Sequence, residues 1–262
     1  MRGIIVRVRM SRLGKVAVSV LSAALLSSGL AHGQSVPNRG STISLRQRIN
    51  LSHLNFLKAE VPYPASPVQG LSTFDPGQPL AVWYTYANYN SQANQYTRVG
   101  SGTYNSSTNT WGQGESALDD IARAVIVYLK HYELFHDATS LANAVAGLRT
   151  ICYLQVTNGP DAGNFYDWMQ PTGEPNLTVD NASSFNWWGS RALWALAEGY
   201  GVLKTANPGE AAYLKSRIDL AMQQMARTVS PAYGHFQSLD GMNSPAWLIG
   251  DGSDASSVAV LG

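Results

Sequence analysis

Two adjacent aspartates, Asp119 and Asp120, stand where an apolar-periodic segment begins and are the first candidates for chemistry in this chain. Two carboxyl groups can catalyse proton transfer together when one stays protonated and the other is ionised. Side chains of neighbouring residues on a helix diverge by about 100°, so this pair is poorly placed to act on one atom. We therefore expect one of the two to work with a carboxyl group from elsewhere, and Asp167 is the best partner.

The same two aspartates also fit a structural role. Ser116 and Asp119 have the spacing of a capping box, and acidic side chains in a first turn interact favourably with the helix dipole. Asp119 is also spaced to pair with Arg123 one helical turn further on. Both interpretations stay open for each aspartate: capping or scaffolding on one side, and a place in a site on the other.

A second cluster combines aromatic rings with carboxylates, in the segment 165–168 and at the start of the next apolar-periodic segment. Sugar rings present apolar C–H faces that stack on aromatic rings, and their hydroxyl groups bind carboxylates and amides. The candidate substrate-binding residues are Tyr166, Trp168, Asp180, Trp187 and Trp188. The alternative for Trp187 and Trp188 is a place in the core, as we expect for Trp194 within its run of Ala and Leu.

The elements that must position these residues form a helical hairpin that occurs twice. One copy opens with Leu-Asp-Asp-Ile-Ala-Arg-Ala at 118–124, and the other opens with Asn-Trp-Trp-Gly-Ser-Arg-Ala at 186–192. Superposing Arg123 on Arg191 also places Tyr132 on Tyr200, and a third start follows at 252–260. Such pairs cannot bury their apolar faces alone, so we expect them to stack or close on one another.

Apolar periodicity gives the bounds of the expected elements in a fold of the mainly α class. The expected helices are a short one at 45–58, a first pair starting at 116 and at 141–156, and a second pair at 184–204 and 208–229. Two segments dense in Val and aromatic residues, 80–89 and 96–104, are expected to form a small N-terminal β hairpin. Within the second helical pair, Glu198 is a candidate partner for Arg191.

The first 33 residues have the features of a secretory signal peptide. Five basic residues lead into an apolar run from Val16 to Leu30, and small residues at Ala31 and Gly33 suit cleavage before Gln34. An uncleaved anchor is the alternative. We expect 34–44 to be a flexible lead-in and 45–262 to be one domain of a secreted or periplasmic protein, without stable membrane insertion after cleavage.

Removal of that segment makes the chain acidic. It holds five of the 18 Lys and Arg residues and none of the 17 Asp and Glu residues, so 13 basic and 17 acidic residues remain, a net charge of −4. Phosphate backbones require a cationic surface, so nucleic acid is not an expected partner. The sequence has no His-x-x-x-His pair, phosphate loop or Gly-x-Ser-x-Gly motif, so no metal or cofactor is expected. The one cysteine, Cys152, is expected to be a buried apolar side chain.

The two hairpin openings resemble those of the six-hairpin glycosidase superfamily, whose members fold as an (α/α)6 toroid. The resemblance rests on Leu-Asp-Asp-Ile-Ala-Arg-Ala and on Phe-Asn-Trp-Trp-Gly-Ser-Arg-Ala-Leu-Trp-Ala-Leu-Ala-Glu-Gly-Tyr, and it covers 116–262. It implies an incomplete toroid of two hairpins and the start of a third, truncated at the C-terminal side. It also implies that Asp119 and Asp120 face a carbohydrate cleft, where glycoside hydrolysis uses two carboxyl groups.

These observations predict an exported, glycoside hydrolase-like protein that acts on an oligo- or polysaccharide. Two alternatives remain. A non-catalytic helical-repeat module would use the aromatic loops to bind glycan or protein. A polysaccharide lyase would abstract a proton beside a uronate carboxylate, and Tyr166 and His235 would then be of more interest than the aspartates. The sequence fixes neither the sugar and its linkage nor the oligomeric state.

Overall fold

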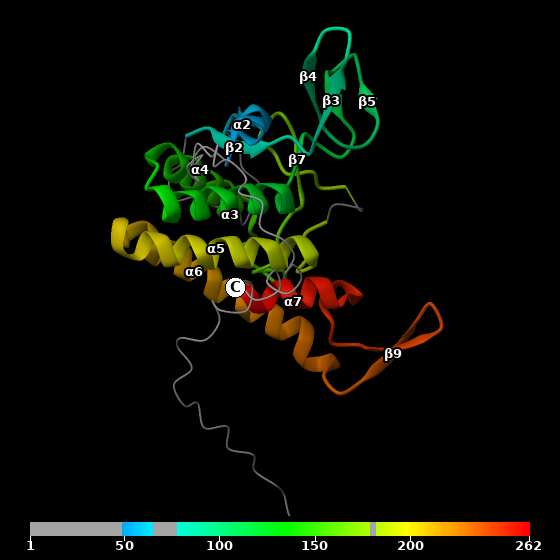
Figure 1. Cartoon of the computed structure of the whole chain (residues 1–262). Coiled ribbons are helices and arrows are strands. Elements are labelled where there is room, and N and C mark those ends of the chain that lie inside the picture. The colour runs from blue at the N-terminus through cyan, green and yellow to red at the C-terminus, as the bar shows by residue number, and fades with distance from the viewer. Residues whose placement is uncertain (1–48, 65–77, 179–181) are drawn as a thin grey trace, which may run out of the picture. The chain divides into compact units, whose positions relative to one another are not determined.

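The computed structural model describes residues 49–64, 78–178 and 182–262, all within one compact unit, Leu45–Gly262. The described chain is mainly helical and carries several two-stranded sheets (Figure 1). The predicted signal peptide and lead-in, together with Asp180, lie outside the described residues. No helix within the described ranges combines the length and apolar character needed to cross a membrane.

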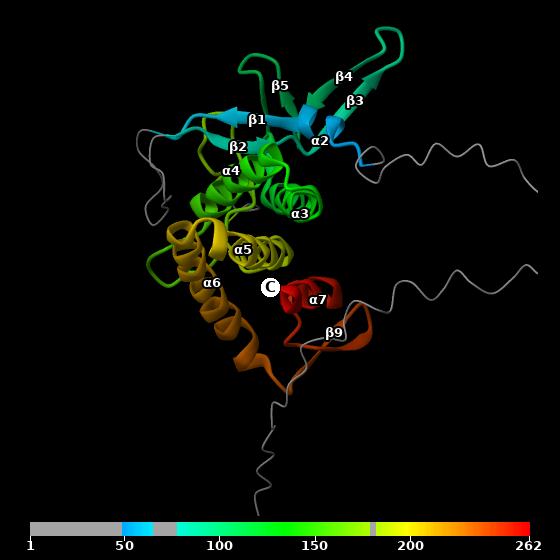
Figure 2. The same cartoon turned by 60° about the vertical axis from the view of Figure 1, so that its left-hand side comes forward.

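Three helices pack in succession through the centre of the unit. They are α3 (Leu118–Phe135), α5 (Trp187–Ala206) and α7 (Ser253–Leu261), and α5 contacts the other two. The return helices α4 (Ala138–Leu154) and α6 (Pro208–Val229) pack on α3 and α5 respectively, as Figure 2 shows. This order confirms both predicted hairpins and the predicted third helical start.

The apolar stripe of α3 forms the centre of the core. Leu118, Ile121, Val125 and Leu129 are fully buried at spacings of three and four. The helix is also buried at Ala124, because neighbours cover it on more than one side. Burial of each of the four stripe residues stabilises this packing by about 1.5–3 kcal/mol.

Two glycines set the close approach of the helices. A Cβ atom on Gly147 of α4 would lie 2.4 Å from Val125 Cγ2 of α3. A Cβ atom on Gly199 of α5 would lie 2.6 Å from Leu148 Cδ1 of α4. Helix α4 therefore fits between its neighbours only because both positions lack a side chain. The same helix buries Cys152 completely, as predicted.

Local signals in the sequence stop and restart the helices at the hairpin turns. Helix α3 ends at His136, which adopts the left-handed conformation and donates its amide to Tyr132 O at 2.7 Å. Asp137 then caps α4 by accepting from the Ser140 amide at 2.9 Å. In the second hairpin, Asn207 caps α6 through the Glu210 amide at 3.3 Å. Short connections of this kind hold successive helices antiparallel.

Short strands and turns complete the unit. Helix α2 spans Ser52–Leu57, shorter than the helix predicted at 45–58. The antiparallel pairs are β1 (Lys58–Val61) with β2 (Leu80–Trp83), β3 (Tyr86–Asn90) with β4 (Gln95–Val99), β5 (Tyr104–Asn105) with β6 (Thr110–Trp111), β7 (Ser116–Ala117) with β8 (Trp168–Met169), and β9 (Phe236–Leu239) with β10 (Met242–Pro245). The 3₁₀ turns are η2 (Ser230–Ala232) and η3 (Ile249–Asp251).

The predicted N-terminal hairpin exists in part. Segment 80–89 is not one strand, because the fully buried residues of β2 pair with β1 and lie against α4, where Thr150 Oγ1 donates to Ala81 O at 2.7 Å. Only β3 pairs with β4, and its residues are largely exposed. The prediction merged a core strand with a surface strand because both are rich in apolar and aromatic residues.

Two local predictions are wrong. Ser116 does not cap α3: it lies in strand β7, and its hydroxyl donates to Trp83 O at 2.5 Å, while Ala117 precedes the helix without a side-chain cap. Glu198 does not pair with Arg191. It accepts from Lys130 Nζ of α3 at 2.6 Å and from Trp194 Nε1 at 3.2 Å.

Candidate active site

The pairing of β7 with β8 brings two distant parts of the chain together at the start of α3. Ala117 lies opposite Trp168 in the sheet, and the Leu118 amide donates to the backbone oxygen of Asp167 at 2.6 Å. Asp167 is therefore fixed beside the first turn of α3, which carries Asp119 and Asp120. The structure thus brings together the three carboxyl groups predicted to be catalytic.

Asp119 is a buried junction between the two hairpins. Its side chain is 4% exposed, and its Oδ2 atom accepts from Arg123 of its own helix and from Arg191 Nη1 of α5 at 2.6 Å. Burial raises the pKa of this carboxyl, and the two guanidinium groups oppose the rise. With both arginines on one oxygen, Asp119 joins α3 to α5 and is shielded from a substrate.

Asp120 is the carboxyl of the first turn that solvent reaches. Its side chain is 21% exposed, and Oδ1 accepts from Arg123 Nη1 at 2.9 Å. Burial and the charge of Asp119 together raise its pKa to about 6, although the neighbouring Arg123 guanidinium lowers it. A carboxyl group with this pKa changes its protonation state in the range where general acid–base catalysis operates.

Asp167 is a buried carboxyl that interacts with both aspartates of α3. Burial and then the charges of Asp119 and Asp120 raise its pKa to about 7, against the lowering effect of the Leu118 amide and Arg191. Its Oδ1 atom is buried without a hydrogen-bond partner among the described residues. A neutral carboxyl is the form that such an environment favours.

Glu115 is a further buried carboxyl, and sequence reasoning missed it. It is 2% exposed, burial raises its pKa to about 7, and its Oε2 atom has no hydrogen-bond partner within the described part of the chain. The only signal in the sequence is its position directly before Ser116–Leu118, a run that the structure buries completely. Its charge also raises the pKa of the Tyr84 hydroxyl, after burial of that ring.

The tryptophans at the start of α5 lie beside this carboxyl cluster. The Arg191 guanidinium, which binds Asp119, stands 5.1 Å from the centre of the Trp187 ring. Trp187 and Trp188 meet edge to face at 5.2 Å, and Trp188 Nε1 donates to Phe165 O at 3.1 Å. Both tryptophans are partly exposed. Arg191 covers Trp187, and the hydrogen bond to Phe165 O holds Trp188.

The other predicted binding residues take different places. Trp168 is 8% exposed within β8, so its ring supports the site from inside. Tyr166 is half-buried, and its amide donates to Leu154 O at 3.0 Å. Burial and the charge of Asp161 raise the pKa of the Tyr166 hydroxyl, so it stays protonated at neutral pH.

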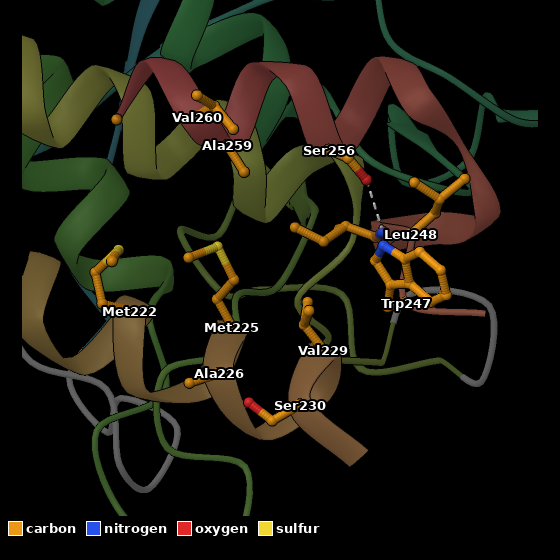
Figure 3. A pocket seen from close by; sticks show the side chains of 12 residues that line it. Met222, Met225, Ala226, Val229, Ser230, Trp247, Leu248, Ser256, Ala259 and Val260 are labelled. Carbon is orange, nitrogen blue, oxygen red and sulfur yellow. Dashed lines mark hydrogen bonds between the residues drawn. The ribbon is translucent and has the colours of Figure 1, made fainter. Parts of the chain in front are cut away.

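A second feature is a cavity of about 510 Å³ between α6 and α7, and its lining is apolar (Figure 3). Met222, Met225 and Val229 of α6 face Ala259 of α7 across it, and Trp247 closes one end. None of the residues that line it carries a titratable side chain, so it offers no acid–base chemistry. In the described ranges, no group of three His, Cys, Asp or Glu side chains is placed to hold a metal ion.

Chemistry at neutral pH is therefore concentrated at the start of α3. There, a partly exposed carboxyl, a buried carboxyl with a high pKa and two arginines lie beside two partly exposed tryptophans. Comparison of the chain with models of known protein families and with curated proteins gives no match.

Proposed function

We propose that this chain is an exported, carbohydrate-active protein of the glycoside hydrolase type, with its helical hairpins arranged as in an (α/α) toroid. The observation that carries the proposal is the pair Asp120 and Asp167, whose pKa values are raised to about 6 and about 7 beside aromatic side chains. The successive packing of α3, α5 and α7 supports the toroid-like arrangement.

The structure suggests a separate role for each carboxyl. Asp120, the accessible group, is ionised above about pH 6 and is the carboxylate proposed to meet the sugar. Asp167 is proposed as a positioning residue that carries a proton up to about pH 7 and holds the first residue of α3 through its backbone oxygen. Asp119 holds Arg123 and Arg191 in place and keeps the two helices in register.

A test needs the full-length chain and a panel of neutral and uronate-containing polysaccharides, with release of reducing ends as the readout. Replacement of the base removes most of the general-base contribution, so Asp120→Asn should lower the rate by about 10²–10⁴-fold. Asp254→Asn is the matched control, because Asp254 is an exposed aspartate in the first turn of α7. Equal rates for Asp120→Asn and the wild-type chain would overturn the proposal.

The burial of Asp167 favours one other function, a non-catalytic glycan-binding module, because only Asp120 of the pair reaches solvent. Binding without release of reducing ends would identify that function. A lyase would instead generate an unsaturated product that absorbs ultraviolet light, and loss of this signal in Tyr166→Phe would assign the lyase role.

A further inference from the structure

A cleft of about 650 Å³ lies between helix α2 and the β3–β4 hairpin, apart from the carboxyl cluster of α3. The residues that line it are Ser52, His53, Phe56, Asn94, Gln95 and Tyr96. In Figure 1 the hairpin projects from the helical body with α2 near its base. The cleft therefore lies between a helix whose Leu54 and Leu57 pack against the core and a hairpin whose residues are largely exposed.

The register of the hairpin places two tyrosines side by side on the face that meets α2. Tyr89 lies opposite Tyr96, with ring centres 5.0 Å apart. The Tyr96 ring continues to His53 at 4.9 Å and to Phe56 at 6.3 Å. Tyr89 and Tyr96 are still 52% and 46% exposed, so a row of aromatic rings remains open to solvent.

Neutral polar groups border this row. The Tyr89 hydroxyl donates to Asn94 Oδ1 at 2.6 Å, which fixes one ring against the turn of the hairpin. The side chains of Ser52, Asn94 and Gln95 are exposed along the cleft. Amide and hydroxyl groups beside aromatic rings match the two surfaces of a pyranose, its hydroxyl edge and its C–H face.

The positive charge of Arg98, beside the cleft, interacts with other groups of the protein. Arg98 stands 5.6 Å from the centre of the Phe56 ring and 5.4 Å from that of Tyr84, and it donates to Lys58 O at 2.9 Å. The guanidinium group thus ties the hairpin to α2 and β1. No carboxylate lines the cleft within the described residues.

We propose that this cleft binds a neutral oligosaccharide by stacking on Tyr96 and Tyr89. It would hold a glycan chain at a second site, separate from the carboxyl cluster. The proposal goes beyond the function proposed above and does not depend on it, because a stacking platform binds sugar whether or not Asp120 is catalytic.

The test measures binding of neutral oligosaccharides of glucose, xylose, mannose and N-acetylglucosamine to the full-length chain by calorimetry. Loss of the central ring should weaken binding by about tenfold in Tyr96→Ala, and Tyr89→Ala should act in the same direction. Tyr96→Phe keeps the ring and should bind nearly as the wild type does. Tyr86→Ala is the matched control, because Tyr86 is 54% exposed on the opposite face of the same strand.

The outcomes separate this site from the active site. Asp120→Asn should keep the stacking-dependent binding even if it abolishes turnover. The proposal is overturned if no neutral oligosaccharide binds the wild-type chain, if Tyr86→Ala weakens binding as much as Tyr96→Ala does, or if only acidic glycans or peptides bind. Tyr89→Ala, measured alongside a thermal melt, decides the question if Tyr96→Ala does not fold.

Discussion

Helices α3 and α5 begin at equivalent points of the repeat but carry opposite chemistry. With Arg123 superposed on Arg191, the residues at Asp119 and Asp120 in α3 correspond to Trp187 and Trp188 in α5. At the start of α5, the Asn186 side chain accepts from the amide of the first helical residue, Trp187, at 2.7 Å. The start of α3 has no side-chain cap and holds two carboxyl groups instead, Asp119 buried and Asp120 partly exposed.

The two equivalent arginines explain how the difference is tolerated. Arg123 and Arg191 both bind Asp119, so the charge supplied by one repeat is balanced in part by the other. The repeat thus provides a common backbone and a common arginine. The chemistry then depends on the residues four and three positions before that arginine, which are aspartates in α3 and tryptophans in α5.

The largest expected effect on stability comes from removing the shared carboxylate. Asp119→Asn leaves Arg191 without its carboxylate at the junction of α3 and α5, and leaves Arg123 with Asp120 alone. We expect the free energy of unfolding to fall by about 2–4 kcal/mol. This is less than the usual loss on breaking a fully buried ion pair, because Arg123 is half-exposed. Urea unfolding measures it, and the exposed Asp254→Asn should change little. A loss below about 0.5 kcal/mol would show that Asp119 does not stabilise the junction of α3 and α5.

The pH dependence of stability should follow the raised pKa values. A carboxyl with a raised pKa stays protonated in the folded chain while the unfolded chain has already lost that proton. The free energy of unfolding contributed by Asp167 therefore falls as pH rises from about 4 to about 7. Asp167→Asn should gain stability relative to the wild type across this range, as urea unfolding at several pH values would show. A constant difference would contradict the account.

A smaller effect is expected from changing the shape of the shared cation. Arg191→Lys keeps the charge but loses the planar group that binds Asp119 and covers the Trp187 ring. We expect a loss of about 1–2 kcal/mol. In the double variant with Asp119→Asn, the loss of stability should be smaller than the sum of the two single losses, because both substitutions remove the same contact. If the two losses simply add, Arg191 does not stabilise the chain through its contact with Asp119.

The smallest effect on stability should come from changing the tryptophans at the start of α5. Trp188→Phe removes the hydrogen bond from Nε1 to Phe165 O and keeps an aromatic ring. We expect a loss of about 1 kcal/mol, measured as a shift of the thermal midpoint. Trp187→Phe is the paired variant, since the structure gives its Nε1 no bond of this kind among the described residues. A loss that is larger for Trp187→Phe would reverse the order proposed here.

The helices were predictable because their signals are local. Periodicity and turn residues place α3 through α7 within a few residues of their observed bounds, and the Arg123–Asp119 pair follows from spacing alone. The contacts that surround the start of α3 could not be predicted from such local signals. Asp167 reaches α3 through the two-residue pairing of β7 with β8, and Arg191 reaches Asp119 from another helix. Such contacts depend on long-range packing, which periodicity does not report.

The proposed function requires that the carboxyl groups at the start of α3 release their protons near neutral pH. Carbon-13 NMR titration of the aspartate side-chain carboxyls in the full-length chain tests it directly. We predict midpoints near 6 for Asp120 and near 7 for Asp167. The Asp167 midpoint should fall in Asp120→Asn, because the neighbouring negative charge is gone. Midpoints close to the ordinary value of 3.8 for both groups would contradict the account.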